Sequence, residues 1–174
     1  MATGFNYVGS LSATNARIFR KGIIANSQVI TVGDATGRDV DGFITIAGVG
    51  NLVEGIVHGI VRSDTKDIAP TSNGAGGNFT DTYTAAVDNE TVSKVSALMD
   101  ISKNSMYAVT LDDTAGSTTG SDLAGGYNAD VVAASDQLDE STTATTTAQF
   151  AILGQNSEVT NGVFVSIKES VIFG

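Results

Sequence analysis

Residues able to carry out chemistry are few in this sequence, and their spacing matches no common catalytic pattern. His58 is the only histidine, so a nucleophile–histidine–carboxylate arrangement would have to use it. It stands in an apolar run between Val57 and Gly59, and the chain contains no Gly-x-Ser-x-Gly elbow. One imidazole also supplies only one metal ligand. We therefore interpret His58 as a structural residue.

Carboxylates are numerous, but their setting does not favour an active site. The two catalytic carboxyl groups of a glycosidase must lie in a cleft whose surroundings give them different pKa values. Most acids here stand in Gly- and Thr-rich stretches, and the chain has no tryptophan to form a sugar platform. Asp112, Asp113 and Asp122 lack the spacing of an EF-hand loop. The sequence thus predicts a protein that is not an enzyme, with no catalytic residue, no metal site and no cofactor.

Charge is distributed unevenly along the chain. The formal net charge is −10 with only nine basic residues, three of which cluster at Arg17, Arg20 and Lys21. Residues 104–167 contain no lysine or arginine. Nucleic acid is a poor partner, because binding it requires clustered basic side chains. The acids suit solvated loops, whereas the basic cluster suits either solubility or docking onto an acidic protein surface.

Targeting and membrane signals are absent from the pattern of apolar residues. A secretory signal begins with a basic region that is followed by an apolar region. Residues 1–7 show neither, so we expect no secretory signal. The most apolar stretch, 44–61, is interrupted by Glu54 and His58. No cysteine is present, so disulfides contribute nothing to stability. We expect a soluble protein made in the cytoplasm.

The composition favours an all-β fold, either a compact β-barrel or a β-sandwich with long polar loops. Thr, Val and Ile suit pleated strands, and Gly, Asn, Asp and Ser suit the turns between them. Glycines inside the apolar run at 52–61 indicate a bulge or a bend. The expected strands are 17–24, 28–32, 43–46, 52–61, 94–101, 106–111, 127–133, 150–153 and 163–173.

The remaining segments predict an arm and several loops around a single β domain at 17–174. Residues 1–16 have no sustained period, and we expect an extended N-terminal arm that orders against a partner or a neighbouring subunit. Residues 65–80 are predicted to be a loop insertion, with a domain linker as the alternative, and residues 136–147 are polar and rich in threonine. Residues 88–99 could instead form a short helix, but we favour a strand from residue 94 that pairs with 106–111 as a hairpin.

Three pieces of the chain together resemble the decoration, or cement, proteins of tailed-bacteriophage capsids. The pieces are FRK at 19–21 with ITVGD at 30–34, GFI at 42–44 with LVEGIVHGI at 52–60, and GYNAD at 126–130 with AQFAILG at 148–154 and NGVFVSI at 161–167. The resemblance covers residues 17–61 and 94–173. It implies a β-barrel type of protein on the outside of the virion, bound to the major capsid protein as a homo-oligomer, with a trimer favoured.

On this resemblance, Arg17, Arg20 and Lys21 are the residues expected to dock onto the capsid. Two alternatives from other classes remain open. A head-fibre or host- or glycan-binding module would need clustered exposed aromatic side chains or a cation site, and a tail or neck component could use the same kind of barrel. Neither nucleic acid nor a membrane is expected as a partner.

Overall fold

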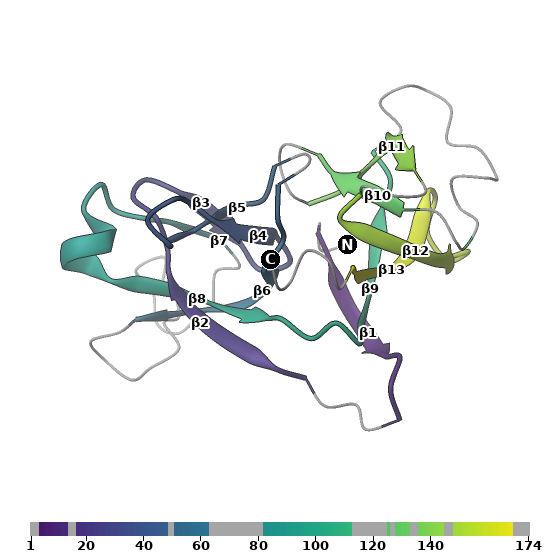
Figure 1. Ribbon diagram of the computed structural model, residues 1–174, viewed down its shortest axis with the longest axis horizontal. Coiled ribbons are helices and arrows are strands. Elements are labelled where there is room, and N and C mark those ends of the chain that lie inside the picture. Colours follow the sequence, from purple (N-terminus) through teal and green to yellow (C-terminus); the bar gives the residue numbers. More distant parts are fainter. Residues whose placement is uncertain are drawn as a thin grey trace.

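The fold is built almost entirely from antiparallel strands, as the sequence predicts. The computed structural model describes residues 4–13, 17–48, 51–62, 82–112, 125, 128–132, 136–144 and 148–168. Within them the strands form two main sheets and a two-stranded ribbon in a sandwich-like arrangement (Figure 1). These described strands leave the sheets open, so of the two expected architectures the sandwich is observed and the closed barrel is not. No helix in the described ranges is long and apolar enough to cross a membrane.

The larger sheet contains six strands in the spatial order β1-β9-β13-β12-β10-β11. In that order their bounds are Asn6–Ser10, Ser105–Thr110, Gly162–Ile167, Phe150–Gln155, Asn128–Val131 and Leu138–Ala144. Val163 lies opposite Val109 and Val165 lies opposite Ile152, so buried side chains face each other across the central strands. Such cross-strand pairs stabilise a sheet.

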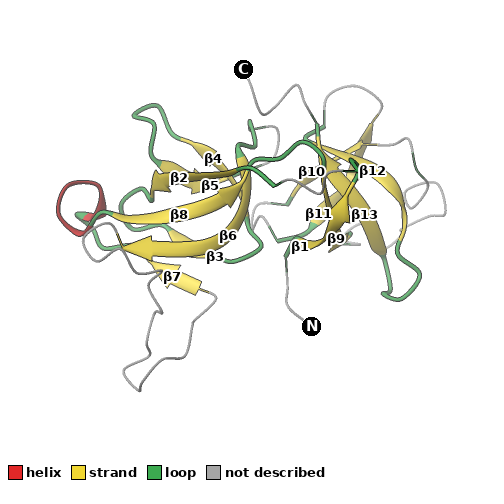
Figure 2. Cartoon of the chain, turned by 90° about the horizontal axis from the view of Figure 1, so that it is seen from below, coloured by secondary structure: helices red, strands yellow, loops and turns green. Residues whose placement is uncertain are grey.

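The smaller sheet contains five strands in the order β2-β8-β6-β4-β5, and a two-stranded ribbon, β3–β7, accompanies it (Figure 2). The five strands span Phe19–Ile23, Val95–Asp100, Gly55–Arg62, Ala35–Arg38 and Ile44–Ile46, and the ribbon Val29–Thr31 and Thr82–Thr84. The chain turns at Lys103 and Asn104 between β8 and β9. These two strands lie in different sheets, however, so the predicted hairpin pairing between them is wrong.

Strand β6 contributes to both hydrophobic cores because neighbouring residues of a strand face opposite sides. Ile56 packs in the core of the larger sheet, whereas Val57 and Ile60 pack in the core of the smaller sheet. Burial on both faces explains why apolar residues occupy successive positions at 56–57 and 60–61 instead of alternating with polar ones.

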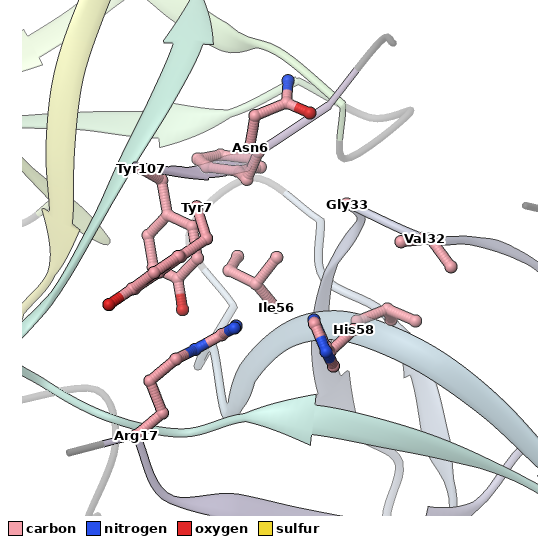
Figure 3. A pocket seen from close by; sticks show the side chains of 10 residues that line it. Asn6, Tyr7, Arg17, Val32, Gly33, Ile56, His58 and Tyr107 are labelled. Atoms are coloured by element: carbon pink, nitrogen blue, oxygen red, sulfur yellow. The ribbon is translucent and has the colours of Figure 1, made fainter. Parts of the chain in front are cut away.

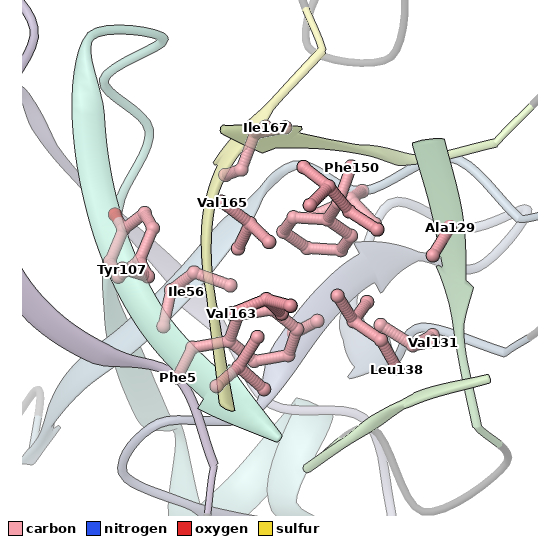
Figure 4. Close-up of a cluster of buried hydrophobic side chains, with 14 of the residues drawn as sticks. Phe5, Ile56, Tyr107, Ala129, Val131, Leu138, Phe150, Val163, Val165 and Ile167 are labelled. Carbon is pink, nitrogen blue, oxygen red and sulfur yellow. The ribbon is translucent and has the colours of Figure 1, made fainter. Parts of the chain in front are cut away.

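The core of the larger sheet is centred on Phe150, whose ring stacks on Phe5 with the centroids 4.6 Å apart (Figure 4). Val163, Val165 and Ile167 alternate along β13 and are all buried, as their spacing predicts. Burying a side chain of this size stabilises the fold by about 1.5–3 kcal/mol.

The N-terminal segment is a strand of the larger sheet, and the expectation that residues 1–16 order only against a partner is wrong for the described part. β1 pairs with β9, and Tyr7 lies opposite Tyr107. Phe5 is 3% exposed, and its amide donates a hydrogen bond to the Gly33 carbonyl at 2.8 Å. The partners of Phe5 lie far along the chain, so no local periodicity reveals them. The segment therefore belongs to the same core as the rest of the domain.

Besides β1, three strands lie where the sequence predicts none. They are β4, β7 and β11, the last within the polar, Thr-rich stretch 136–147. β11 pairs with β10, which places the fully buried Leu138 opposite Val131. β11 contains two consecutive threonines, and β-branched residues favour strands. The expected insertion at 65–80 and the end of the last expected strand, 169–173, lie outside the described residues.

A helical turn, Asn89–Ser93, precedes β8, so the strand favoured from residue 94 is confirmed and the alternative helix extends no further than Ser93. The turn is held by the side chain of Asn89, which is fully buried. Its amide nitrogen donates to the carbonyls of Ile24 and Val95, and its oxygen accepts from the Val95 N–H at 2.9 Å. One side chain thus joins the turn to the beginning of β8 and to the end of β2.

Replacing Asn89 with alanine should lower the free energy of unfolding by about 2 kcal/mol, because it leaves buried backbone groups without partners. Asp88→Ala is the matched control, since Asp88 is exposed and makes no side-chain capping bond. Urea denaturation of both variants measures the difference. Equal losses for the two variants would contradict this role of Asn89.

Candidate functional site

The three residues predicted to dock onto a capsid lie in different surroundings. Lys21 is exposed on β2, and the side chain of Arg20 is 56% exposed while it pairs with Glu54. The side chain of Arg17 is only 17% exposed, because it forms an ion pair with Asp100 inside the protein. Arg20 and Lys21 are adjacent in a strand and therefore point to opposite faces. The structure does not combine the three into one basic patch.

Arg17 lies between two aromatic rings and a buried carboxylate. Its Nε donates to Oδ2 of Asp100 at 2.7 Å. Its guanidinium carbon lies 4.0 Å from the ring centroid of Tyr7 and 4.7 Å from that of Phe19, which are cation–π distances. Arg17 thus joins β1, β2 and the end of β8.

Asp100 is fully buried and accepts hydrogen bonds from several groups. In addition to Arg17, it accepts from the Ser105 hydroxyl at 2.7 Å and from the Ser102 N–H at 3.0 Å. Burial by itself raises the pKa of a carboxyl, but the hydrogen bonds from Ser105, Arg17 and Ser102 outweigh it and hold the pKa of Asp100 below its usual value. Asp100 is therefore a carboxylate at neutral pH, and this explains how a charge is tolerated at this depth.

A second ion-pair cluster lies at the same end of the smaller sheet, because Glu54 directly precedes β6 and Ile56 of β6 pairs with Asp100. Glu54 accepts from Arg20 at 3.0 Å and from both Nε and Nη2 of Arg38, the latter at 2.8 Å. Burial raises the pKa of Glu54, but these two arginines more than compensate and lower the pKa overall. Glu54 thereby connects β2 and β4, which lie on opposite sides of β6 and β8.

His58 lies at a bulge in β6 and points outward. The pairing with β8 shifts between Val57 and Gly59, which confirms the bulge that the glycines predicted. The imidazole is exposed and packs on Phe19 with the ring centroids 5.0 Å apart. Burial of part of the ring, followed by the nearby charge of Arg17, lowers the pKa of His58, so it is neutral at pH 7. His58 therefore lines the surface between the sheets.

A pocket of about 420 Å³ lies between the two sheets, beside these residues (Figure 3). Tyr7, Arg17, His58 and Tyr107 contribute its polar groups, and Figure 3 shows the Arg17 guanidinium directed into it between Tyr7 and His58. The apolar wall is formed by Phe5, Val32, Ile56 and Val57.

Arg17 and His58 offer hydrogen-bond donors to this pocket, whereas the Tyr107 hydroxyl is sealed inside the protein. The Tyr107 hydroxyl is buried beside Asp100 and Ser105 without a well-aligned hydrogen bond to any described residue. Burial raises the pKa of Tyr107, so the hydroxyl keeps its proton. Among the residues that the structure describes, no group of three His, Asp or Glu side chains could hold a metal ion.

Sequence reasoning did not identify this pocket. One signal in the sequence pointed to a residue of the pocket. Tyr107 alternates with Val109 and Leu111 in a predicted strand, so its side chain faces inward with theirs. The partners of Arg17, which are Tyr7 and Asp100, are distant in the sequence and stand in no recognisable motif. No protein-family model matches the chain, and no curated protein matches it in sequence.

Proposed function

We propose that this chain is a viral structural protein that binds the outer surface of a tailed-phage capsid and stabilises the shell. The partner is the major capsid protein, and the site of action is the exterior of the virion after synthesis in the host cytoplasm. A homo-oligomer, with a trimer favoured, follows from the resemblance to decoration proteins. The support consists of that resemblance and of the distribution of exposed side chains.

The observation that carries the proposal is a surface of exposed apolar and basic side chains near the N-terminus. This docking surface consists of Phe19 and Lys21, which share one face of β2, and of Leu11 and Ile18 beside the neighbouring turn, and its three apolar members, Leu11, Ile18 and Phe19, are 54%, 59% and 42% exposed. Two of them flank the turn after β8, because the Leu11 amide donates to Asn104 and the Ile18 carbonyl accepts from Ile101. Apolar groups beside cations, on a chain of net charge −10, suit an acidic protein surface.

The use of the described charged groups also supports a structural role. Asp100 and Glu54 are buried acids that form three ion pairs with arginines, and these pairs connect strands of the smaller sheet to one another and to neighbouring segments. Charges arranged in this way hold strands together. A shell-stabilising protein requires this rigidity, because its binding energy must reinforce the shell rather than order the protein itself.

Reversing the charge of Lys21 should weaken capsid binding by at least about tenfold, since like charges then meet across the interface. Binding of Lys21→Glu to capsids purified without this protein is measured by co-sedimentation at several salt concentrations. Lys94→Glu is the control, because it makes the same change in net charge at the exposed end of the helical turn. Equal binding of the two variants would remove Lys21 from the docking surface.

The broader proposal is tested on the particle itself. The protein should co-purify with virions at a fixed stoichiometry, and adding it back to depleted heads should raise their resistance to heat. Electron microscopy then places it on the head and distinguishes this function from a tail or neck component, while light scattering of the free protein gives the oligomeric state. Recovery of the protein only from infected-cell lysate, never from particles, would refute the proposal.

A further inference from the structure

We propose that the outer edge of β2 binds an extended, acidic segment of the major capsid protein as an additional strand. The inference rests on the proposed function, because it states how the docking surface recognises its partner. Three observations support it, which are an internal repeat of the fold, an edge that is covered in one half of the chain but not in the other, and the charge beside that edge.

The two halves of the chain repeat one five-stranded unit. In chain order, the first unit contains β2, β4, β5, β6 and β8, and the second unit contains β9, β10, β11, β12 and β13. In both units the first strand pairs with the fifth, the fifth with the fourth, the fourth with the second, and the second with the third. Two parallel bridges then join the first strand to the third in the same way, from Ile24 to Ile44 and from Leu111 to Leu138.

The register of the strands is repeated as well. The pairing of β6 with β8 shifts within residues 57–59, and the pairing of β12 with β13 shifts at the corresponding place, within residues 152–154. The bridge residues Ile24 and Leu111 each follow directly on the first strand of their unit. Each residue of β2 therefore has a counterpart in β9 that is found by counting back from these two positions.

The outer edge of β9 is covered by β1 (Figure 1). β1 pairs with Met106 and Ala108 on the side of β9 that faces away from β13. Phe5, just before β1, stacks on Phe150 and lies edge-on to Tyr107, so it belongs to the core of the second unit. The second unit thus shows what the edge of its first strand accepts, which is a short extended segment with a side chain directed inward.

The corresponding edge of β2 has no strand beside it among the described residues. The Ile24 amide donates to Val95 across the pair with β8, and bonded residues alternate in an antiparallel pair, so residues 20 and 22 also face β8. The backbone groups of Phe19 and Lys21 therefore point away from it. These two residues are the counterparts of the pair in β9 that β1 covers, and both are exposed. An edge of this kind binds a partner by strand addition.

The charge beside this edge indicates an acidic segment. Lys21 forms no ion pair with a described residue, and Arg20 and Arg38 share the single carboxylate of Glu54. An acidic side chain on the added strand would form a cross-strand pair with Lys21, and an apolar one would cover the exposed ring of Phe19. The added strand would thus use the same side chains that the docking surface exposes.

The test compares two substitutions at one position. Lys21→Pro removes the outward N–H and leaves the bonds to β8, because proline is accepted in an edge strand where its nitrogen faces away from the sheet. Lys21→Ala removes the same charge but keeps the N–H, so it is the matched control. In co-sedimentation with capsids purified without this protein, Lys21→Pro should bind at least about tenfold more weakly than Lys21→Ala. Circular dichroism of both variants checks that the fold is kept.

Hydrogen exchange of the natural chain gives a second measurement that needs no substitution. The amides of Phe19 and Lys21 should exchange at least about tenfold more slowly on the capsid than in the free protein, because the added strand accepts their hydrogen bonds. The amide of Val87, which is exposed before the helical turn and lies outside the docking surface, should exchange at the same rate in both states.

The outcomes separate this proposal from the proposed function. If Lys21→Pro binds capsids as tightly as Lys21→Ala, or if exchange at Phe19 and Lys21 is unchanged on the capsid, strand addition is refuted and capsid binding stands. If the natural chain does not bind capsids, both proposals are refuted. If Lys21→Pro instead lowers the molecular mass of the free protein in light scattering, the added strand comes from a second copy of this chain, and its assignment to the capsid protein is wrong.

Discussion

Replacing Arg17 with alanine should lower the free energy of unfolding by about 3–5 kcal/mol, which is a large part of the stability of a domain of this size. The loss arises because Asp100 is left as a fully buried carboxylate without its cation. Ser105 and Ser102 still donate to it, but neither carries a charge. The substitution also removes the guanidinium from between the rings of Tyr7 and Phe19. Urea denaturation at pH 7 measures the effect.

Two further variants show whether the unpaired charge is the cause. Adding Asp100→Asn to Arg17→Ala should recover much of the loss, because the double variant no longer buries an unpaired charge. Lys21→Ala removes a cation from the exposed strand β2 and serves as the control, with little expected effect. The pKa of Asp100 is lowered in the folded protein, so its stabilising effect is present above the unfolded pKa and is lost as the pH falls through the folded pKa. A loss that is the same at pH 3 and pH 7, or that the double variant keeps in full, would contradict the explanation.

Local patterns were sufficient to predict most of the strands. Val163, Val165 and Ile167 have the period of a half-buried strand, and the glycines around His58 marked a bulge correctly. The errors arose where pairing is non-local. Strands β8 and β9 are joined by a short turn, but β8 pairs with β2 and β6 whereas β9 pairs with β1 and β13, so the chain moves from one sheet to the other at that turn.

The candidate site was less predictable, for a related reason. A cluster of Arg17, Arg20 and Lys21 in the sequence suggests one basic surface, but burial and pairing separate its members. Arg17 and Asp100 are separated by 83 positions in the sequence, and no spacing rule predicts a contact between such distant residues. The sequence contains few aromatic residues, but the fold brings two of them, Tyr7 and Phe19, against the Arg17 guanidinium.

Replacing Asp34 with asparagine should stabilise the protein at neutral pH by up to about 3 kcal/mol. Burial, and the nearby charge of Asp136 to a smaller extent, raise the pKa of Asp34 from 3.8 to about 6, even though the carboxylate accepts from the Thr31 N–H at 2.7 Å. A raised carboxyl pKa means that the folded state holds its proton more tightly than the unfolded state. The contribution of Asp34 is therefore most favourable below about pH 4, declines as the pH rises to about 6, and is constant above that value.

The difference between the variant and the natural chain isolates Asp34, because Asp100 and Glu54 titrate identically in both and act in the opposite direction. That difference should approach zero near pH 4 and reach its maximum above pH 6, since asparagine can still accept the Thr31 N–H and carries no charge at any pH. Asp41→Asn makes the same change in net charge in an exposed turn and should show no such rise. Thermal unfolding between pH 4 and pH 8 measures all three proteins. If the difference in stability between Asp34→Asn and the natural chain does not change across that range, the Asp34 carboxyl ionises in the folded protein without a free-energy cost. The turn before β4 would then be accessible to solvent.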